Sequence, residues 1–239
     1  MGVTGVQGRR AELGSRLVAV RGRIADACVV AGRDPGEVTL IAVTKTFPAA
    51  DVRLLSDLGV RDVGENRDQE AAPKAARCAD LAPMLTWHFI GQLQTNKTAS
   101  VVGYAGVVHS VDRLRLVRAL GAAARKAGRS VTCLVQVSLD RDEARAGVPE
   151  PEVPALAAAV AEEEGLALGG VMAMAPLDVP PAQAFAPLPR IAGAVRAVYP
   201  DAVIVSAGMS GDLEAAIAAG ATHVRVGTAL LGGRPGFVR

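Results

Sequence analysis

The sequence has few aromatic residues, and its charges of opposite sign nearly balance. Aromatic side chains make up 3% of the 239 residues, so the stacking surfaces that bind single-stranded nucleic acid are scarce. The 26 basic and 24 acidic residues leave a net charge of +2 and are spread along the whole chain. A nucleic acid or an anionic membrane is therefore not an expected partner.

Cysteine and long apolar runs are also scarce. The three cysteines, Cys28, Cys78 and Cys133, lie far apart and form no CxxC or Cys/His cluster. This pattern predicts neither a disulfide framework nor a metal site. No apolar run reaches the roughly 18 residues of a membrane span, and the first residues lack the apolar core of a signal peptide. We therefore expect a protein of the reducing cytoplasm.

Short apolar segments alternate with helical segments along the chain. Several of the short segments are continuous runs of Val, Ile and Leu, as is typical of parallel strands covered on both faces. The pattern predicts strands over residues 38–45, 60–66, 86–91, 107–111, 131–138, 166–174, 202–208 and 223–227. The intervening segments repeat apolar residues at spacings of three and four, and several end on a glycine suited to a helix C-terminus.

These repeated strand–helix units favour a single closed barrel. Eight units in about 200 residues fit a (β/α)8 TIM barrel, and no GxGxxG follows the first strand as it does in an open dinucleotide-binding sheet. We expect one domain over residues 1–239, with residues 1–8 disordered and an extra amphipathic helix over 9–31 before the first strand.

In such barrels the reactive groups follow the carboxyl ends of the strands. The first strand ends on Lys45 in AVTKTFP. A lysine there is more often structural, but at a barrel mouth desolvation would favour the neutral amine that forms a Schiff base. Lys45 is therefore a candidate for covalent bonding to a carbonyl group.

The last two strands are followed by small residues that open helical turns. Exposed backbone N–H groups, hydroxyls and helix N-termini at this position suit a phosphate, although Gly and Ser are also ordinary turn residues. The sequence predicts a phosphate site built from Ser206, Gly208, Met209, Ser210, Gly227 and Thr228.

Arg225 lies within the last apolar strand, two residues before Gly227 and on the same face. A buried guanidinium needs a partner. That partner is either a neighbouring acid, in an ion pair, or a ligand held between Lys45 and the phosphate site.

The second and third strands end on polar residues, in GEN (64–66) and HFIG (88–91). Glu65 and His88 could supply the acid–base pair of a cofactor-free barrel that acts on phosphorylated sugars. This alternative leaves Lys45 and Arg225 without a role. A histidine beside a tryptophan, as His88 is, more often simply packs.

The order of the motifs resembles a known family. AVTKTFP, GEN, HFIGQLQTNK, HSVD, GVMAM, GMSGDLEAAIAAG and VRVGTALLG follow one another as in the pyridoxal phosphate homeostasis proteins, the YggS/PROSC family. The resemblance extends from about residue 8 to 234.

This resemblance implies a barrel of the alanine racemase N-terminal type (fold type III) that binds pyridoxal 5′-phosphate. The family's cofactor lysine falls on Lys45, which would hold the cofactor as a Schiff base, and the arginine near the pyridine nitrogen falls on Arg225. Asn66 and His88 would lie near the cofactor. The phosphate segment falls on Ser206, Gly208, Met209, Ser210, Gly227 and Thr228.

The resemblance further implies a carrier involved in vitamin B6 homeostasis, without catalytic residues or dedicated turnover. Apo forms of pyridoxal phosphate-dependent enzymes are candidate recipients of the cofactor, and we expect a monomer. Two positions depart from the family pattern: Ser138 stands where Asn is frequent, and Arg145 where Lys is frequent. Arg145 puts in doubt a second lysine that would receive the cofactor from Lys45.

The alternative function is a fold-type III enzyme, an amino-acid racemase or decarboxylase. Racemisation needs a base on each face of the cofactor, and related racemases take a tyrosine from a second domain. Tyr104 and Tyr199 both precede predicted strands and so belong to the opposite end of the barrel from Lys45. An arginine at the pyridine nitrogen also weakens the ring as an electron sink. Both points favour the carrier.

Overall fold

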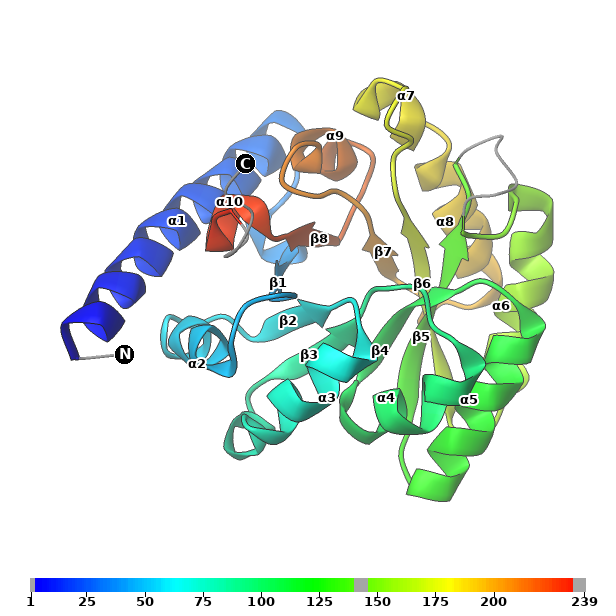
Figure 1. Ribbon diagram of the computed structural model, residues 1–239. Helices are drawn as coiled ribbons and strands as arrows, with labels where there is room; N and C mark the ends of the chain where they lie inside the picture. The colour runs from blue at the N-terminus through cyan, green and yellow to red at the C-terminus, as the bar shows by residue number, and fades with distance from the viewer. Residues whose placement is uncertain (1–2, 140–145, 234–239) are drawn as a thin grey trace.

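The computed structural model describes residues 3–139 and 146–233. Eight parallel strands close into a barrel in chain order, β1 to β8, with β8 paired to β1 (Figure 1). The predicted strands and the predicted (β/α)8 barrel are both confirmed. The strands are β1 Thr39–Val43, β2 Asp62–Glu65, β3 Thr86–Phe89, β4 Val107–Val111, β5 Val131–Val137, β6 Leu166–Ala173, β7 Ile204–Ser206 and β8 His223–Val226.

Helices surround the barrel, and short helical turns open several of the loops. The α-helices are α1 Val3–Val30, α2 Ala49–Asp57, α3 Asp68–Ala76, α4 Thr98–Tyr104, α5 Leu114–Ala127, α6 Val153–Glu162, α7 Pro181–Phe185, α8 Leu188–Val198, α9 Leu213–Ala218 and α10 Thr228–Leu231. The 3-10 turns are η1 Pro35–Glu37, η2 Ala79–Leu81, η3 Thr95–Lys97 and η4 Glu150–Glu152. No helix in the described parts of the chain combines the length and apolar composition needed to cross a bilayer.

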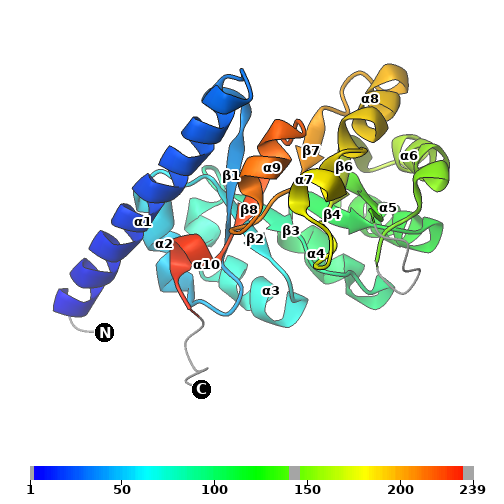
Figure 2. The ribbon, with the colours of Figure 1, turned by 90° about the horizontal axis from the view of Figure 1, so that it is seen from above.

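Helix α1 precedes the barrel and packs against α9, α10 and α2 (Figure 2). Its buried residues recur at spacings of three and four, which places them on one face: Leu13, Leu17, Val20, Ile24, Ala27 and Cys28. They join the apolar layer between the barrel and its outer helices. The helix begins earlier than the sequence predicts, and residues 3–8, for which we expected disorder, form its first turns.

Side chains alternate along the strands between this outer layer and the barrel interior. The interior contains a small apolar layer of Val107, Leu134 and Met172, against which Ile204 packs. The interior also holds buried polar residues: His88, His109, Ser206 and Arg225 are all at most 4% exposed. Ser206 and Arg225 lie on β7 and β8, the strands that the predicted phosphate loops follow, and His88 and His109 lie on β3 and β4.

Candidate functional site

The candidate residues at the ends of β1 and β8 lie side by side. Arg225 pairs with Ile41 in the register of these two strands. Two residues further on, a Cβ placed on Gly227 would lie 3.5 Å from that of Val43, an ordinary contact. Lys45 follows Val43 by two residues and is half-buried. The structure thus brings the Lys45 loop and the Gly227–Thr228 loop together at the carboxyl end of the barrel.

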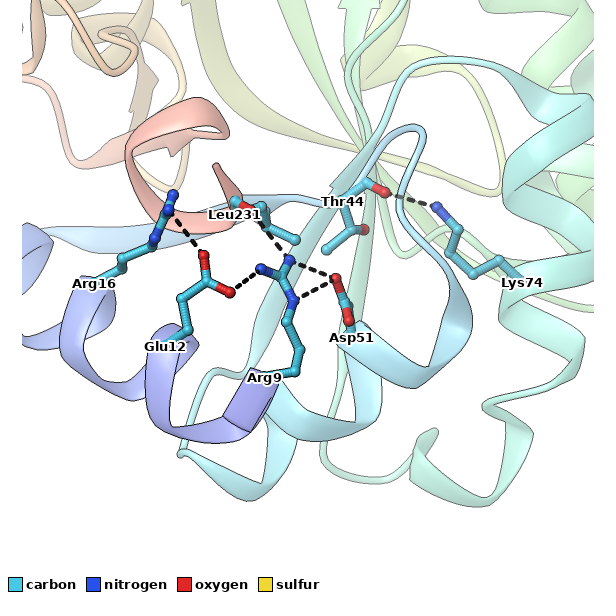
Figure 3. Close-up of polar contacts among 7 residues, drawn as sticks. All are labelled: Arg9, Glu12, Arg16, Thr44, Asp51, Lys74 and Leu231. Carbon is cyan, nitrogen blue, oxygen red and sulfur yellow. Dashed lines mark hydrogen bonds and ion pairs between the residues drawn. The ribbon is translucent and has the colours of Figure 1, made fainter. Parts of the chain in front are cut away.

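The Lys45 loop is held by a buried ion pair. Lys74 of α3 donates to the carboxylate of Glu65 (2.6 Å). It also donates to the backbone carbonyl of Thr44 (2.7 Å) (Figure 3). The Thr44 hydroxyl donates to the same Glu65 oxygen at 2.6 Å. Burial raises the pKa of Glu65, and the Lys74 ammonium opposes that rise. These contacts fix the residue immediately before Lys45.

The residue after Lys45 has an uncommon backbone conformation. Thr46 has φ +69°, a left-handed value that costs a β-branched residue free energy, and its N–H donates to Glu70 at 3.1 Å. Lys45 therefore stands in a turn whose two flanking residues are fixed by α3. A strained turn of this kind is frequent at ligand sites.

The loops after β7 and β8 contact each other. The backbone N–H of Ala229 donates to the Ser210 hydroxyl at 3.3 Å, which joins the β7–α9 loop to the start of α10. Gly208 has φ +88°, and a Cβ there would approach that of Ala216 to 2.6 Å, so only glycine fits this turn. Thr228 is exposed, and so is Met209. Hydroxyls and backbone amides from two helix starts thus lie on one small surface, a donor set that suits a phosphate.

Two arginines of α1 contact the loops and helices that form this surface. Arg9 donates to the carbonyl of Leu231 in α10 (3.1 Å) and forms an ion pair with Asp51 of α2 (2.7 Å) (Figure 3). Arg23 donates to the carbonyl of Ser210 at 3.0 Å and pairs with Glu214 of α9. The extra helix therefore fixes both predicted phosphate loops and the helix that follows the Lys45 loop.

Arg225 points into the barrel and is 4% exposed. Its guanidinium donates to the Ser206 hydroxyl (2.6 Å) and to the carbonyl of Ala173 (3.0 Å). Burial lowers its pKa to about 10. Among the described residues no carboxylate lies within ion-pair distance of it, so the ion pair that the sequence left open is not formed there. A buried cation held by neutral oxygens suits an electron-rich ligand atom at the mouth.

Two predicted site residues lie deeper than expected. The Ser206 hydroxyl is fully buried and contacts Arg225 and His109, and therefore does not face the phosphate loops. His88 is buried inside the barrel, where its ring nitrogens bond His109 (2.8 Å) and Asp62 (3.0 Å). Asp62 is the first residue of β2, so His88 points away from the mouth.

The remaining predicted positions lie at the mouth or outside the described residues. Asn66 is half-buried just after β2, and Gly91, two residues after β3, passes so close that a Cβ there would overlap the Asn66 carbonyl. Ser138 follows β5 and lines a cavity of about 290 Å³ together with Met174 and Met209. Arg145 lies outside the described residues.

The acid–base pair of the sugar-phosphate alternative is not assembled. Glu65 faces outward to Lys74, whereas His88 faces the barrel interior. Sequence reasoning overlooked His109, Asp62 and Lys74. Strand alternation in HSV (109–111) could have indicated an inward His109, but only the closed barrel reveals its partners.

Comparisons with known proteins assign the fold to a family. Residues 25–235 match the family described as alanine racemase, N-terminal domain. The chain is 45% identical over 243 residues to a pyridoxal phosphate homeostasis protein of Mycobacterium tuberculosis strain H37Rv, covering 95% of this chain and 94% of that protein. The protein of the same name from Escherichia coli K12 is 37% identical over 227 residues, with 93% and 97% covered.

A solved structure adds a ligand to this comparison. PipY of Synechococcus elongatus, determined with pyridoxal phosphate bound, is 36% identical and superimposes with a TM-score of 0.78, covering 92% of this chain and all of that one. These matches span nearly the whole length of each protein. The chain therefore belongs to the alanine racemase N-terminal domain family and, within it, to the pyridoxal phosphate homeostasis proteins.

Proposed function

We propose that this protein binds pyridoxal 5′-phosphate at the carboxyl end of its barrel and takes part in cytoplasmic vitamin B6 homeostasis. The observation that carries the proposal is the convergence, at one end of the barrel, of the Lys45 turn, the buried Arg225 guanidinium and the bridged loops of Ser210 and Thr228. A relative 36% identical has been solved with the same cofactor, which supports the assignment.

Each part of the cofactor has a complementary group in this arrangement. The Lys45 amine would bond the aldehyde carbon as a Schiff base, with loss of water. Ser210, Thr228 and the backbone N–H groups beside them would hold the phosphate, with Gly208, Met209 and Gly227 shaping the loops. Arg225, held by Ser206, would donate to the pyridine nitrogen, and Asn66 would border the ring. The bound cofactor supplies an electrophilic carbon and an electron sink.

The protein holds the cofactor without dedicated turnover in this proposal. Tyr104 ends α4 and Tyr199 follows α8, so both tyrosines lie near the amino ends of the next strands, away from Lys45. A donating arginine leaves the pyridine nitrogen unprotonated and the electron sink weak. Apo-enzymes that need the cofactor are the proposed recipients, and a monomer suffices for the site. The three buried free thiols are consistent with a reducing cytoplasm.

The test of binding is chemical labelling of the holoprotein. Borohydride reduction followed by peptide mass spectrometry should place the phosphopyridoxyl group on Lys45, with Lys97, a half-buried lysine of the η3 turn after β3, as the matched control. Lys45→Ala should abolish the label and the visible absorbance, whereas Lys97→Ala should keep both. A label confined to Lys74, Lys97 or Lys126 would refute the assignment.

The test of function uses the same holoprotein. Incubation with L-alanine, D-alanine, lysine and ornithine should give neither racemisation nor decarboxylation at a sustained rate, while an apo-enzyme mixed with it should gain activity. Sustained turnover that Lys45→Ala abolishes would instead establish a racemase or decarboxylase.

A further inference from the structure

All three histidines of the chain lie inside the barrel, and two of them belong to a continuous chain of hydrogen bonds. His88 Nδ1 lies 2.8 Å from His109 Nε2, and His109 Nδ1 lies 2.9 Å from Ser206 Oγ. At one end His88 Nε2 contacts Asp62 Oδ1 at 3.0 Å, and at the other Arg225 Nη1 contacts Ser206 Oγ at 2.6 Å. Five side chains from β2, β3, β4, β7 and β8 thus connect the amino end of the barrel to the arginine below the mouth.

The two ends of this chain fix the direction of every hydrogen bond in it. Arg225 can only donate, and the Asp62 carboxylate can only accept. Because Ser206 Oγ accepts from Arg225, its single proton is available to His109 Nδ1. His109 then carries its own proton on Nε2 and donates to His88 Nδ1. His88 in turn carries its proton on Nε2 and donates to Asp62.

The reverse direction is unfavourable. It would turn an unprotonated His88 Nε2 toward the Asp62 carboxylate, so two acceptors would face each other at 3.0 Å. It would also make Ser206 accept two donors and leave its hydroxyl proton without a partner in the chain. The one-way arrangement satisfies each link with both histidines neutral.

The surroundings keep His109 neutral. His109 is fully buried, and burial, followed by the neighbouring His88 and Arg225, holds its pKa well below the usual range. His223, whose ring centroid lies 6.4 Å from that of His88, bonds the Thr222 hydroxyl and lies off the chain. The charged groups that face the chain are therefore Asp62 at one end and Arg225 at the other, with Asp212 acting on Arg225 from the β7–α9 loop.

We propose that Asp62, His88 and His109 are positioning residues for the cofactor: through Ser206 they hold the Arg225 guanidinium in the orientation in which it donates to the pyridine nitrogen. The inference rests on the proposed function, which assigns Arg225 to that nitrogen. Breaking the chain frees the Ser206 hydroxyl to turn away, so the guanidinium keeps only the Ala173 carbonyl as a fixed acceptor.

The first experiment needs no substitution. With three histidines in the chain, the side-chain 15N spectrum of the uniformly labelled apoprotein contains three imidazole pairs. His109 should be a neutral Nε2–H tautomer between pH 6 and 8, and His88 should carry a proton on Nε2. A proton on His109 Nδ1, or a doubly protonated His109 in this range, would overturn the proposal.

The second experiment measures the NMR resonance of the cofactor itself, which is labelled with 15N in the pyridine ring. His109→Leu and Asp62→Ala should each move the ring-nitrogen resonance and weaken pyridoxal phosphate binding by about 3- to 10-fold, the effect of one hydrogen bond. Asp62→Asn keeps an acceptor oxygen for His88 and should restore the resonance. His223→Gln, a substitution of an interior histidine off the chain, should leave the resonance and the affinity as in the wild type.

The outcomes separate this inference from the proposed function. A wild-type protein that takes up no pyridoxal phosphate on Lys45 refutes the function and, with it, the inference. A wild type that binds on Lys45, combined with His109→Leu and Asp62→Ala proteins of unchanged resonance and affinity, refutes the positioning chain alone. Asp62 is at the barrel rim, with a side chain 22% exposed, so its substitution should leave the fold intact.

Discussion

Two buried polar clusters lie on opposite sides of the barrel wall, and they satisfy their polar groups in different ways. Outside the wall, Glu65 and Lys74 are 0% and 7% exposed and keep opposite charges in direct contact. Inside, two histidines and a serine relay hydrogen bonds between Asp62 and Arg225, whose charges do not touch. The first cluster fixes the backbone next to Lys45, and the second fixes the side chain of Arg225.

The difference indicates how each cluster responds to change. Among the residues that the structure describes, Glu65 Oε2 in the outer cluster is buried without a hydrogen-bond partner, so the stability of this cluster depends on the single Lys74 ammonium. In the inner chain each side chain between the two ends has a hydrogen-bond partner on both sides. The chain should therefore tolerate the loss of a charge at one end, but not the protonation of a histidine within it. The outer cluster should therefore be sensitive to substitution and the inner one to pH.

The largest effect should come from removing the outer cation. Lys74→Met leaves the Glu65 carboxylate buried without its counter-charge, which should lower the free energy of unfolding by about 3–5 kcal/mol. Urea unfolding at pH 7.5 measures this. The Glu65→Gln/Lys74→Met double variant removes the stranded charge and should recover much of the loss. A single variant that loses less than about 1 kcal/mol would show that the ion pair carries little stability.

Acidification should lower the free energy of unfolding through the histidines of the barrel interior. Burial holds the pKa of His109 well below its usual value and lowers that of His223 to about 4. Below pH 6.5 the unfolded chain therefore binds protons that the folded protein refuses, so stability falls as the pH falls. Between pH 7.5 and 5.5 the two histidines should together cost about 2–3 kcal/mol.

Urea unfolding at these two pH values, on the wild type and on His223→Gln, checks this effect. The variant lacks one of the two titrating groups and should lose about half as much stability on acidification. An unfolding free energy that does not change over this range would mean that the interior accepts protons.

The smallest effect concerns the turn that the outer cluster holds. Thr46→Gly relieves the positive φ but adds freedom to the unfolded chain, so we expect a net gain of about 0.5–1 kcal/mol. Thr46→Ala keeps a Cβ and should gain less. Thermal unfolding of both variants compares them, and a loss of stability in the glycine variant would show that the strain is not stored at Thr46.

The same contrast explains what the sequence could predict. Strands β1, β5 and β6 are rich in apolar residues, and α1 repeats its apolar residues at helical spacing, so local pattern was enough to predict the barrel. The Lys45 and Ser210 positions follow from the rule that loops after barrel strands form the mouth. These predictions depend only on residues near one another in the chain.

The two polar clusters could not be predicted in this way. In the sequence, Lys74 looks like an ordinary helical lysine, because its burial against Glu65 depends on how α3 packs on β2. His88 faces inward, as alternation allows, but its partner His109 and the direction away from the mouth depend on the register of neighbouring strands. Contacts across a closed barrel depend on its stagger, which single-strand patterns do not contain.

Two arginines of α1 make contacts that can form only late in the synthesis of the chain. Arg9 reaches the Leu231 carbonyl across 222 residues, and Arg23 reaches Glu214 across 191. A ribosome adding about 5–20 residues per second needs on the order of 10–40 s to make the intervening chain. During that interval the apolar face of α1 has no α9 or α10 to cover it, and neither phosphate loop is braced. Only the finished polypeptide should therefore bind the cofactor. The uncovered apolar face of α1 is the part of the nascent chain to which a chaperone should bind first.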